Sequence, residues 1–280
     1  MSEQKAVKDR RILAVLTAVA GVLMFSVVPV AVARAMDAVL KGSALKIQAT
    51  GNQLLTTGPK IVITFWPFWG GLCITAGVIL LYVAWAIYKG QIWAKPVAIG
   101  LLALPAITGA YFSGPIMFFN KSAMQYFLII ALIGLIPYFV LLLWGSTGKG
   151  EKWSKFFVFL LLGVVAAFSF SNGGSALRIF MARPEPYVLT SGQYGLLLGI
   201  PVVWIGVLMV MVSIPLLAAF SPRGYRMAVM GLFVNLVGTA VLYLSNFDTF
   251  EFLLGIILIG ISLALLLIPS IKGKILRGNA

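Results

Sequence analysis

The chain has 280 residues, of which 61% are hydrophobic and only 10% are charged. Soluble domains carry charge on roughly a quarter of their residues, so this composition excludes a soluble protein and indicates an integral membrane protein. The sequence contains no histidine, which excludes histidine-ligated haem, histidine-bound metals and acid–base catalysis by imidazole.

Eight segments are apolar over the length of about 20 residues that a helix needs to cross a bilayer. In chain order they are residues 12–33, 61–88, 96–119, 125–144, 156–171, 194–220, 227–244 and 252–271. Transmembrane β-strands alternate apolar and polar residues, whereas residues 127–136 are apolar without interruption. We therefore predict an all-α integral membrane protein with eight transmembrane helices.

The basic residues predict the orientation, because Lys and Arg favour cytoplasmic loops. If the N-terminus is cytoplasmic, most of the 21 Lys and Arg but fewer than half of the seven acidic residues lie on the cytoplasmic side. Both termini are therefore predicted to be cytoplasmic. The net charge of +14 is attributed to this topology and to attraction by anionic lipid headgroups on that side. No nucleic-acid partner is expected.

Parts of the sequence recur in its second half. The hexapeptide GSALKI at residues 42–47 recurs as GSALRI at residues 174–179, and LTTG at residues 55–58 recurs as LTSG at residues 189–192. Both matches occur in the same order and between the first and second span of each half. Such self-similarity indicates an internally repeated membrane protein.

Each half contains four spans, and an even number of spans returns the chain to the side on which it started. We predict two tandem four-helix repeats with the same orientation, related by a pseudo-twofold axis along the membrane normal. The first repeat comprises residues 1–146 and the second residues 156–280, and residues 147–155 form a polar cytoplasmic linker.

The repeated hexapeptide lies in two long segments on the predicted outer side, residues 34–60 and 172–193. Its Gly-Ser start and its apolar residues around one basic residue predict a short helix or turn at the outer membrane interface. The hexapeptide either caps each bundle, or the two copies together form a docking surface. The docking candidates are Ser43, Lys46, Ser175 and Arg178.

Small and polar residues form two stripes at helical spacing. The first lies near the centre of the seventh span and consists of Gly231, Asn235, Gly238 and Thr239. The second lies on the third span and consists of Ala106, Ala110 and Gly114. Such stripes allow a neighbouring helix to approach closely, and an amide in one of them can bond to that helix. Alternatively, Asn235 lines a polar cavity or binds a lipid carbonyl.

Tryptophans near the ends of the predicted spans indicate contact with lipid headgroups, where amphipathic rings are enriched. Trp93, Trp144 and Trp153 lie at the predicted cytoplasmic ends, and Trp66 and Trp69 lie near the outer end of the second span. Stacking against a ligand is the alternative role for these rings.

The eight predicted spans contain no Asp, Glu, Lys, Arg or His. Ionisable groups inside a bilayer mark ion pathways, proton relays or covalently held cofactors, so none of these functions has a candidate residue. Cys73 is the single cysteine, cannot pair within the chain and is expected to pack as a small apolar residue. No metal or cofactor is predicted, whereas bound lipid is expected.

Residues 66–71, with the sequence WPFWGG, and the following Gly77 resemble the second span of the membrane-spanning four-domain tetraspan family. Members of that family have four helices and cytoplasmic termini, and no catalysis is known for them. The resemblance implies tetraspan units without enzymatic activity, and it transfers no functional residue to this chain.

Two functions fit these observations. The first is a non-catalytic accessory or scaffold subunit of a larger membrane complex, in which the small-residue helix faces contact other membrane subunits. The alternative is a transporter or channel for a neutral, apolar or lipid substrate that uses a groove between the two repeats. An enzyme acting at the outer surface through Asp37, Glu185 or the loop arginines would need polar groups that converge, and the sequence offers only scattered ones, so no catalysis is predicted.

Overall fold

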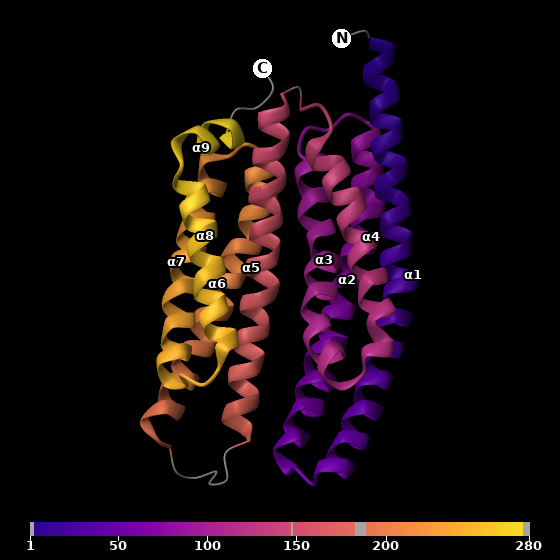
Figure 1. The fold of residues 1–280 in the computed structure, drawn as a ribbon. Coiled ribbons are helices and arrows are strands. Elements are labelled where there is room, and N and C mark those ends of the chain that lie inside the picture. Colours follow the sequence, from indigo (N-terminus) through magenta and orange to yellow (C-terminus); the bar gives the residue numbers. More distant parts are fainter. Residues whose placement is uncertain (1–2, 147, 183–188, 277–280) are drawn as a thin grey trace.

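The computed structural model describes residues 3–146, 148–182 and 189–276, which are almost entirely helical (Figure 1). Among these residues, eight helices are long and apolar enough to span a membrane. They are α1 (Glu3–Thr50), α2 (Thr57–Tyr88), α3 (Ala94–Phe119), α4 (Met124–Leu143), α5 (Lys149–Met181), α6 (Ser191–Ala218), α7 (Pro222–Ser245) and α8 (Phe250–Leu267). The short helices η1 (Gln53–Thr56), η2 (Lys121–Ala123) and α9 (Pro269–Leu276) accompany them. The prediction of an all-helical multi-pass membrane protein is therefore confirmed.

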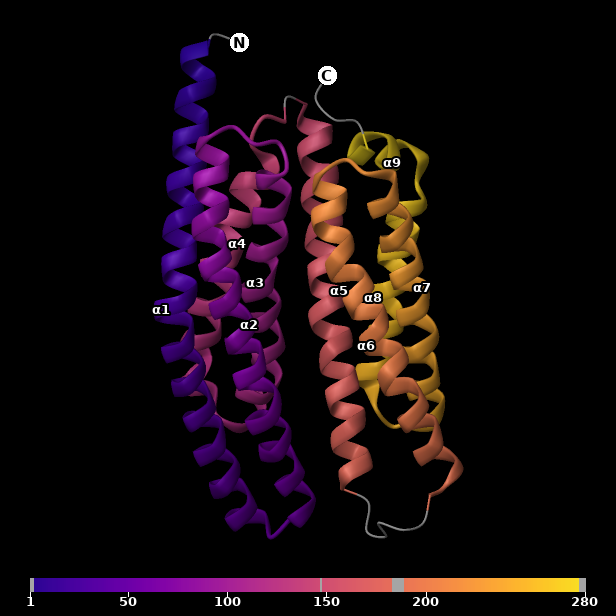
Figure 2. The same ribbon diagram turned by 180° about the vertical axis from the view of Figure 1, so that it is seen from behind.

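The eight long helices form two four-helix bundles that lie side by side (Figures 1 and 2). In the first bundle α1 packs on α2, α2 on α3, α3 on α4 and α4 on α1, and α5 to α8 follow the same order in the second. Helix α3 also contacts α5 and α6, so these three helices form most of the boundary between the bundles, which we call the seam.

The start of α1 and the short helix α9 lie at the same end of the molecule (Figure 1). We call this end the proximal end and the opposite end the distal end. The turns between α2 and α3 and between α6 and α7 also lie at the proximal end, as expected for helices that run up and down in succession.

Among the described residues, the two segments predicted to lie between the spans are mostly helical, so the prediction of a separate short helix or turn for the hexapeptide is wrong. Helix α1 continues to Thr50 and α5 to Met181, and both hexapeptides lie within them. No proline follows Pro29 in α1, and its later residues are mostly good helix formers. The helix ends only at Gly51, whose φ of 64° is readily adopted by glycine. At 48 residues, α1 is about 70 Å long and extends beyond a bilayer core.

Two predicted boundaries also differ from the structure. Helix α5 begins at Lys149, so most of the predicted linker is helical. Helix α8 ends at Leu267, whereas the predicted eighth span continued to residue 271. Ile268 has an extended ψ of 117° because the residue before a proline disfavours the helical conformation, and Pro269 then begins α9.

Two glycines allow α1 and α2 to pack closely. A Cβ atom on Gly77 would lie 2.7 Å from the carbonyl oxygen of Gly21, and one on Gly21 would lie 2.8 Å from the carbonyl oxygen of Gly77. Lipid tails are as apolar as the side chains, so helices in a membrane associate through van der Waals packing of this kind. The contact stabilises the first bundle.

Candidate functional site

The seam contains a cavity at each end, and residues from both bundles line both cavities. The proximal cavity has a volume of about 1070 Å³. The distal cavity is smaller, with a volume of about 180 Å³. Since ligand cavities favour boundaries between helix groups, the seam is the candidate functional site.

The walls of the proximal cavity are mostly apolar. The first bundle contributes the turn before α3, the start of α3 and the end of α4, and the second contributes α5, the end of α6 and α9. The apolar lining residues include Trp93, Pro96, Leu142, Phe159, Leu216 and Ile275. Two lysines, Lys95 and Lys155, add positive charge to this lining.

Lys95 lies in the first turn of α3 and is partly buried. Its Nζ donates a hydrogen bond to the carbonyl oxygen of Trp144, at 2.9 Å. The two ion pairs found among the described residues, Lys41–Asp37 and Lys155–Glu151, do not include Lys95. Its ammonium group is therefore held by a neutral acceptor.

Lys155 lies in the second turn of α5 and is only 4% exposed. Its Nζ pairs with the carboxylate of Glu151 and donates to the hydroxyl of Ser146 at 3.2 Å. The ring of Phe220, at the end of α6, lies 4.8 Å from the same nitrogen, within the range of a cation–π contact. The buried Lys155 thus connects α5, α6 and the segment between α4 and α5, which we call the link between the bundles.

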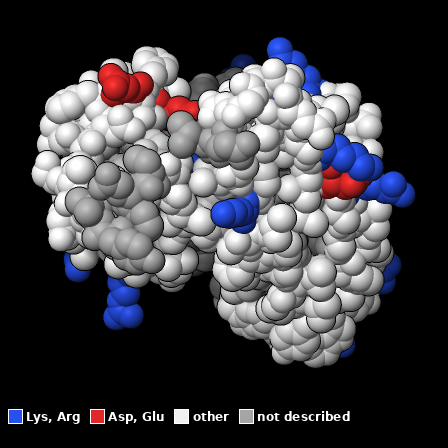
Figure 3. Space-filling view, turned by 90° about the horizontal axis from the view of Figure 1, so that it is seen from below, with Lys and Arg blue, Asp and Glu red and all other residues white. Residues whose placement is uncertain are grey.

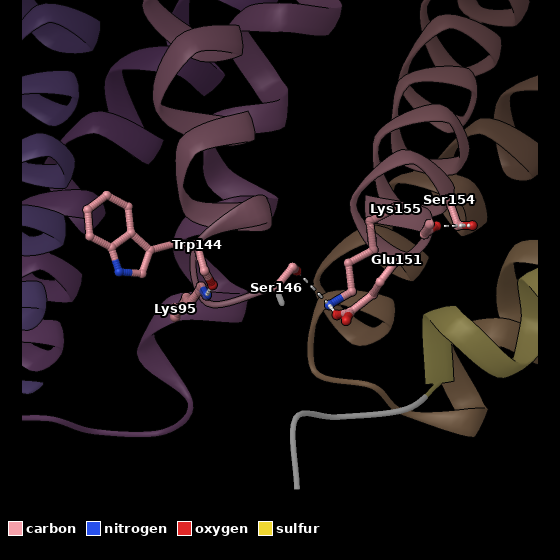
Figure 4. A network of polar contacts seen from close by, with 7 residues as sticks. Lys95, Trp144, Ser146, Glu151, Ser154 and Lys155 are labelled. Atoms are coloured by element: carbon pink, nitrogen blue, oxygen red, sulfur yellow. Dashed lines mark hydrogen bonds and ion pairs between the residues drawn. The ribbon is translucent and has the colours of Figure 1, made fainter. Parts of the chain in front are cut away.

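Figure 4 shows how the link between the bundles separates the two lysines. Lys95, in the first bundle, donates to the carbonyl of Trp144. Lys155, in the second bundle, donates to the side chain of Ser146. The sequence prediction missed this pair, since it attributed both lysines to membrane orientation. Each directly precedes an apolar run, but nothing in the sequence showed that α3 and α5 are neighbours.

An aromatic cluster lies on the seam between the two cavities. It consists of Phe65 and Trp69 of α2, Tyr111 of α3, Phe170 of α5 and Trp204 of α6. The rings of Trp69 and Tyr111 both meet Phe170 edge-on at 5.0 Å, and Phe170 stacks on Trp204 at 5.6 Å. Tyr111 also lines the distal cavity, so the cluster lies next to that cavity.

Trp66 and Trp69 do not anchor the protein at lipid headgroups, and this prediction is wrong. Trp66 is 0% and Trp69 is 2% exposed, and Trp66 stacks on Phe112 with the ring centroids 4.1 Å apart. The Trp66 ring faces α3 and the Trp69 ring faces α5, because these helices pack on that side of α2. Neither indole N–H has a hydrogen-bond partner within the described part of the chain.

The distal cavity brings together part of the second hexapeptide. Ser175 and Arg178 line it, and the Ser175 hydroxyl donates to the carboxylate of Glu251 at 3.0 Å. Figure 3 views the distal end, where basic and acidic side chains stand in small groups among uncharged atoms.

The first hexapeptide has different surroundings. Ser43 is 1% exposed and donates to the carbonyl of Leu40, so it cannot contact a partner in this conformation. The Nζ of Lys46 lies over the ring of Phe118, 3.4 Å from its centroid. Of the four docking candidates, Ser175 and Arg178 line the distal cavity, Ser43 is buried, and Lys46 lies against Phe118, which lines the same cavity.

Asn235 lies at the contact between α6 and α7 and does not line either cavity. It is 0% exposed, and its amide, oriented to match its neighbours, donates to the carbonyl of Val203 at 3.0 Å and accepts from the N–H of Val207 at 3.2 Å. A Cβ on Gly231 would lie 2.9 Å from the Cβ of Met209, and one on Gly238 would lie 2.8 Å from the Val203 nitrogen.

Thr239, the last residue of this stripe, is also buried, and its hydroxyl has no partner among the described residues. A Cβ on Gly255 of α8 would lie 3.1 Å from the Thr239 methyl carbon. The stripe around Asn235 therefore holds α7 against α6 and α8, and helix packing is the role that its contacts support.

The stripe on α3 is divided in the structure. The backbone of Ala106 packs against Gly134 of α4, Ala110 is exposed and Gly114 lines the distal cavity. The close approach of α3 and α4 instead uses Gly109, where a Cβ would lie 2.8 Å from the Cβ of Ala131.

The remaining candidate residues do not form a reactive or metal-binding group. Asp37 pairs with Lys41 at 2.8 Å on an exposed face of α1, and Glu185 lies outside the described residues. No three His, Cys, Asp or Glu gather within reach of one metal ion in the ranges that the structure describes. Cys73 is buried, and its Sγ lies 3.5 Å from the Thr108 hydroxyl.

Comparison of the chain with protein-family models, with curated proteins and with solved structures found no match. The resemblance of residues 66–71 to the tetraspan family therefore stays a prediction. The geometry of the seam is the basis on which a function can be proposed.

Proposed function

We propose that the protein is a membrane carrier for an amphiphilic molecule of the lipid class, which it binds in the seam between its two bundles. The observation that carries this proposal is the proximal cavity of about 1070 Å³, which both bundles line with mostly apolar residues. This volume lies slightly above the range of about 300–1000 Å³ that is typical of small-molecule sites.

Two cavities at opposite ends of one seam support a carrier over a static binding protein. The aromatic cluster lies between them, with Phe170 and Trp204 in one bundle and Phe65, Trp69 and Tyr111 in the other. If the bundles rock against each other, these rings part and the cavities communicate. Rocking of two related bundles around a substrate between them is a common transport mechanism.

We also propose that the two bundles are tandem repeats related by a pseudo-twofold axis, with the proximal end in the cytoplasm. The shared order of helix contacts supports the repeat. The lysines of the proximal end, among them Lys95, Lys152 and Lys274, support the orientation. Attachment of cysteine-directed labels to intact cells, with single cysteines placed at each end, tests the orientation.

The accessory-subunit interpretation remains a competing proposal that rests on the sequence alone. It predicts that gentle extraction yields a stable complex with other membrane proteins and that the isolated chain moves no lipid. The carrier proposal predicts lipid movement by the isolated chain, so one reconstitution experiment separates the two.

The experiment uses a cysteine pair that can lock the seam. A Cβ on Gly100 of α3 would lie 2.9 Å from the Cβ of Pro215 of α6, which is shorter than the separation of roughly 3.5–4.5 Å found in disulfides, so a small outward shift of the two helices would allow the bond. Gly100→Cys and Pro215→Cys are combined with Cys73→Ala, so that the engineered pair provides the only thiols.

The variant is reconstituted into vesicles that contain a short-chain fluorescent lipid, and added albumin extracts this lipid from the outer leaflet. We expect lipid from the inner leaflet to become extractable in the presence of the protein. Oxidation of the cysteine pair should stop this movement, and thiol reduction should restore it. The two single-cysteine variants are the control. Movement that persists in verified cross-linked protein would overturn the carrier proposal.

A further inference from the structure

We propose that the occupant of the proximal cavity is a lipid with an anionic phosphate headgroup, held between the ammonium groups of Lys95 and Lys155. This inference rests on the proposed function, because it assumes that a lipid enters the cavity, and it adds the chemistry of the headgroup.

Charge is the first argument. Lys95 and Lys155 approach the same cavity from different bundles, and Glu151 is the carboxylate that pairs with one of them. Lys274 of α9 adds positive charge nearby, since its Nζ would lie 3.3 Å from a Cβ on Gly150 at the start of α5. Lysine charge in apolar surroundings is unfavourable unless it is compensated, so the cavity favours an anion.

The present partners of the two lysines are the second argument. Lys95 donates to a backbone carbonyl, and Lys155 donates to the Ser146 hydroxyl in addition to its ion pair. Trp144 and Ser146 both belong to the link between the bundles. A phosphate oxygen is a stronger acceptor than a neutral carbonyl or hydroxyl, because a bond between two charged groups is about twice as strong as a neutral one.

The walls of the cavity are the third argument. Beyond the lysines, the lining consists mainly of aromatic and aliphatic side chains, including Phe159 of α5, Leu216 of α6 and Ile275 of α9. A small hydrophilic anion would leave these walls without apolar contacts. Acyl chains would cover them, and the two ammonium groups would lie where the headgroup enters.

Glu151 allows the direction of a change in lipid affinity to be predicted and tested. Its carboxylate pairs with Lys155, so it would compete with a phosphate for the same ammonium group. Neutralising it by Glu151→Gln should therefore tighten the binding of an anionic lipid. A gain in affinity cannot be produced by misfolding, unlike a loss on removal of buried Lys155.

Native mass spectrometry of the full chain in detergent tests the proposal with three probes. The probes are phosphatidylglycerol, phosphatidylcholine with the same acyl chains, and glycerol phosphate without acyl chains. Phosphatidylglycerol should bind about tenfold more tightly than phosphatidylcholine, and Lys95→Met or Lys155→Met should each remove most of this preference. Glu151→Gln should increase it. Lys272→Met is the matched control, because Lys272 lies over Tyr225 at the same end and does not line the cavity.

Each outcome separates the headgroup proposal from the carrier proposal. If both lipids bind equally and the lysine variants change nothing, the headgroup proposal fails and the carrier proposal stands. If neither lipid binds, both fail. If glycerol phosphate competes as well as the lipid does, the site takes a soluble phosphate, and the lipid is the wrong occupant. An equal loss in Lys272→Met would indicate attraction to the whole basic end and would also overturn the proposed site.

Discussion

Trp204 of α6 meets Phe65 of α2 across the seam, with the ring centroids 5.4 Å apart. The indole Nε1 of Trp204 also donates to the carbonyl of Phe170, at 3.5 Å, which fixes the ring in the cluster. The two bundles therefore touch through aromatic rings next to the distal cavity. This contact both stabilises the closed seam and, in the proposed mechanism, must break during transport.

Removal of this ring should loosen the closure. In Trp204→Ala we expect faster lipid movement than in the unchanged protein, because the barrier between the cavities is smaller. The free energy of unfolding should fall by about 2 kcal/mol, given the lost ring contacts and packing. Denaturation in detergent and the vesicle assay measure the two effects. Trp153→Ala is the control, since Trp153 is 59% exposed at the proximal end. Unchanged or slower movement would contradict the assigned role.

The role of Asn235 can be separated from that of the seam. In Asn235→Ala, loss of the hydrogen bonds to α6 should lower the free energy of unfolding by about 1 kcal/mol, as for other hydrogen bonds between membrane helices. Lipid movement by the folded fraction should not change, because Asn235 lines neither cavity. If movement is lost while stability is retained, Asn235 belongs to the substrate path.

Gly77 should tolerate no larger side chain. Gly77→Ala places a methyl group 2.7 Å from the carbonyl of Gly21, so α1 and α2 must separate and stability should fall by about 1–3 kcal/mol. Gly71→Ala on the same helix is the matched control, because a Cβ there meets no atom within 4 Å among the described residues. Thermal unfolding in detergent compares the two variants. Equal stability of both would show that the close contact is absent in solution.

Phe220 has a left-handed backbone conformation, with a φ of 57°. Glycine adopts this conformation without the cost that a Cβ imposes, which is about 1–2 kcal/mol. Phe220→Gly and Phe220→Ala both remove the ring that faces Lys155, so their difference reports the backbone alone. The glycine variant should unfold at the higher denaturant concentration. A more stable alanine variant would exclude the left-handed conformation.

The sequence was sufficient to predict the eight membrane helices, because uninterrupted apolar runs such as residues 127–136 have few other structures available. Helix lengths were harder to predict. The segment after Ala33 carries Arg34, Asp37 and Lys41, which indicated an exposed loop, but charged residues are also good helix formers once the chain leaves the bilayer.

The seam could not be predicted, because a hydropathy pattern does not determine which helices become neighbours. Trp66 and Trp69 were expected at the membrane surface from their position along α2, whereas the direction of their side chains depends on where α3 and α5 pack. Lys95 and Lys155 are far apart in the sequence and meet one cavity only through the contact of α3 with α5. The stripe around Asn235 was recognisable because its spacing is local to one helix.

The central claim is that a lipid enters the proximal cavity. Photo-crosslinking with a phosphatidylglycerol that carries a diazirine in its acyl chain tests it most directly, with the labelled peptides identified by mass spectrometry. We predict label on cavity residues such as Phe159, Leu216 and Ile275, and loss of that label in Lys95→Met. Label confined to outward-facing residues, such as Ile136 and Val237, which are 57% and 58% exposed, would contradict the account.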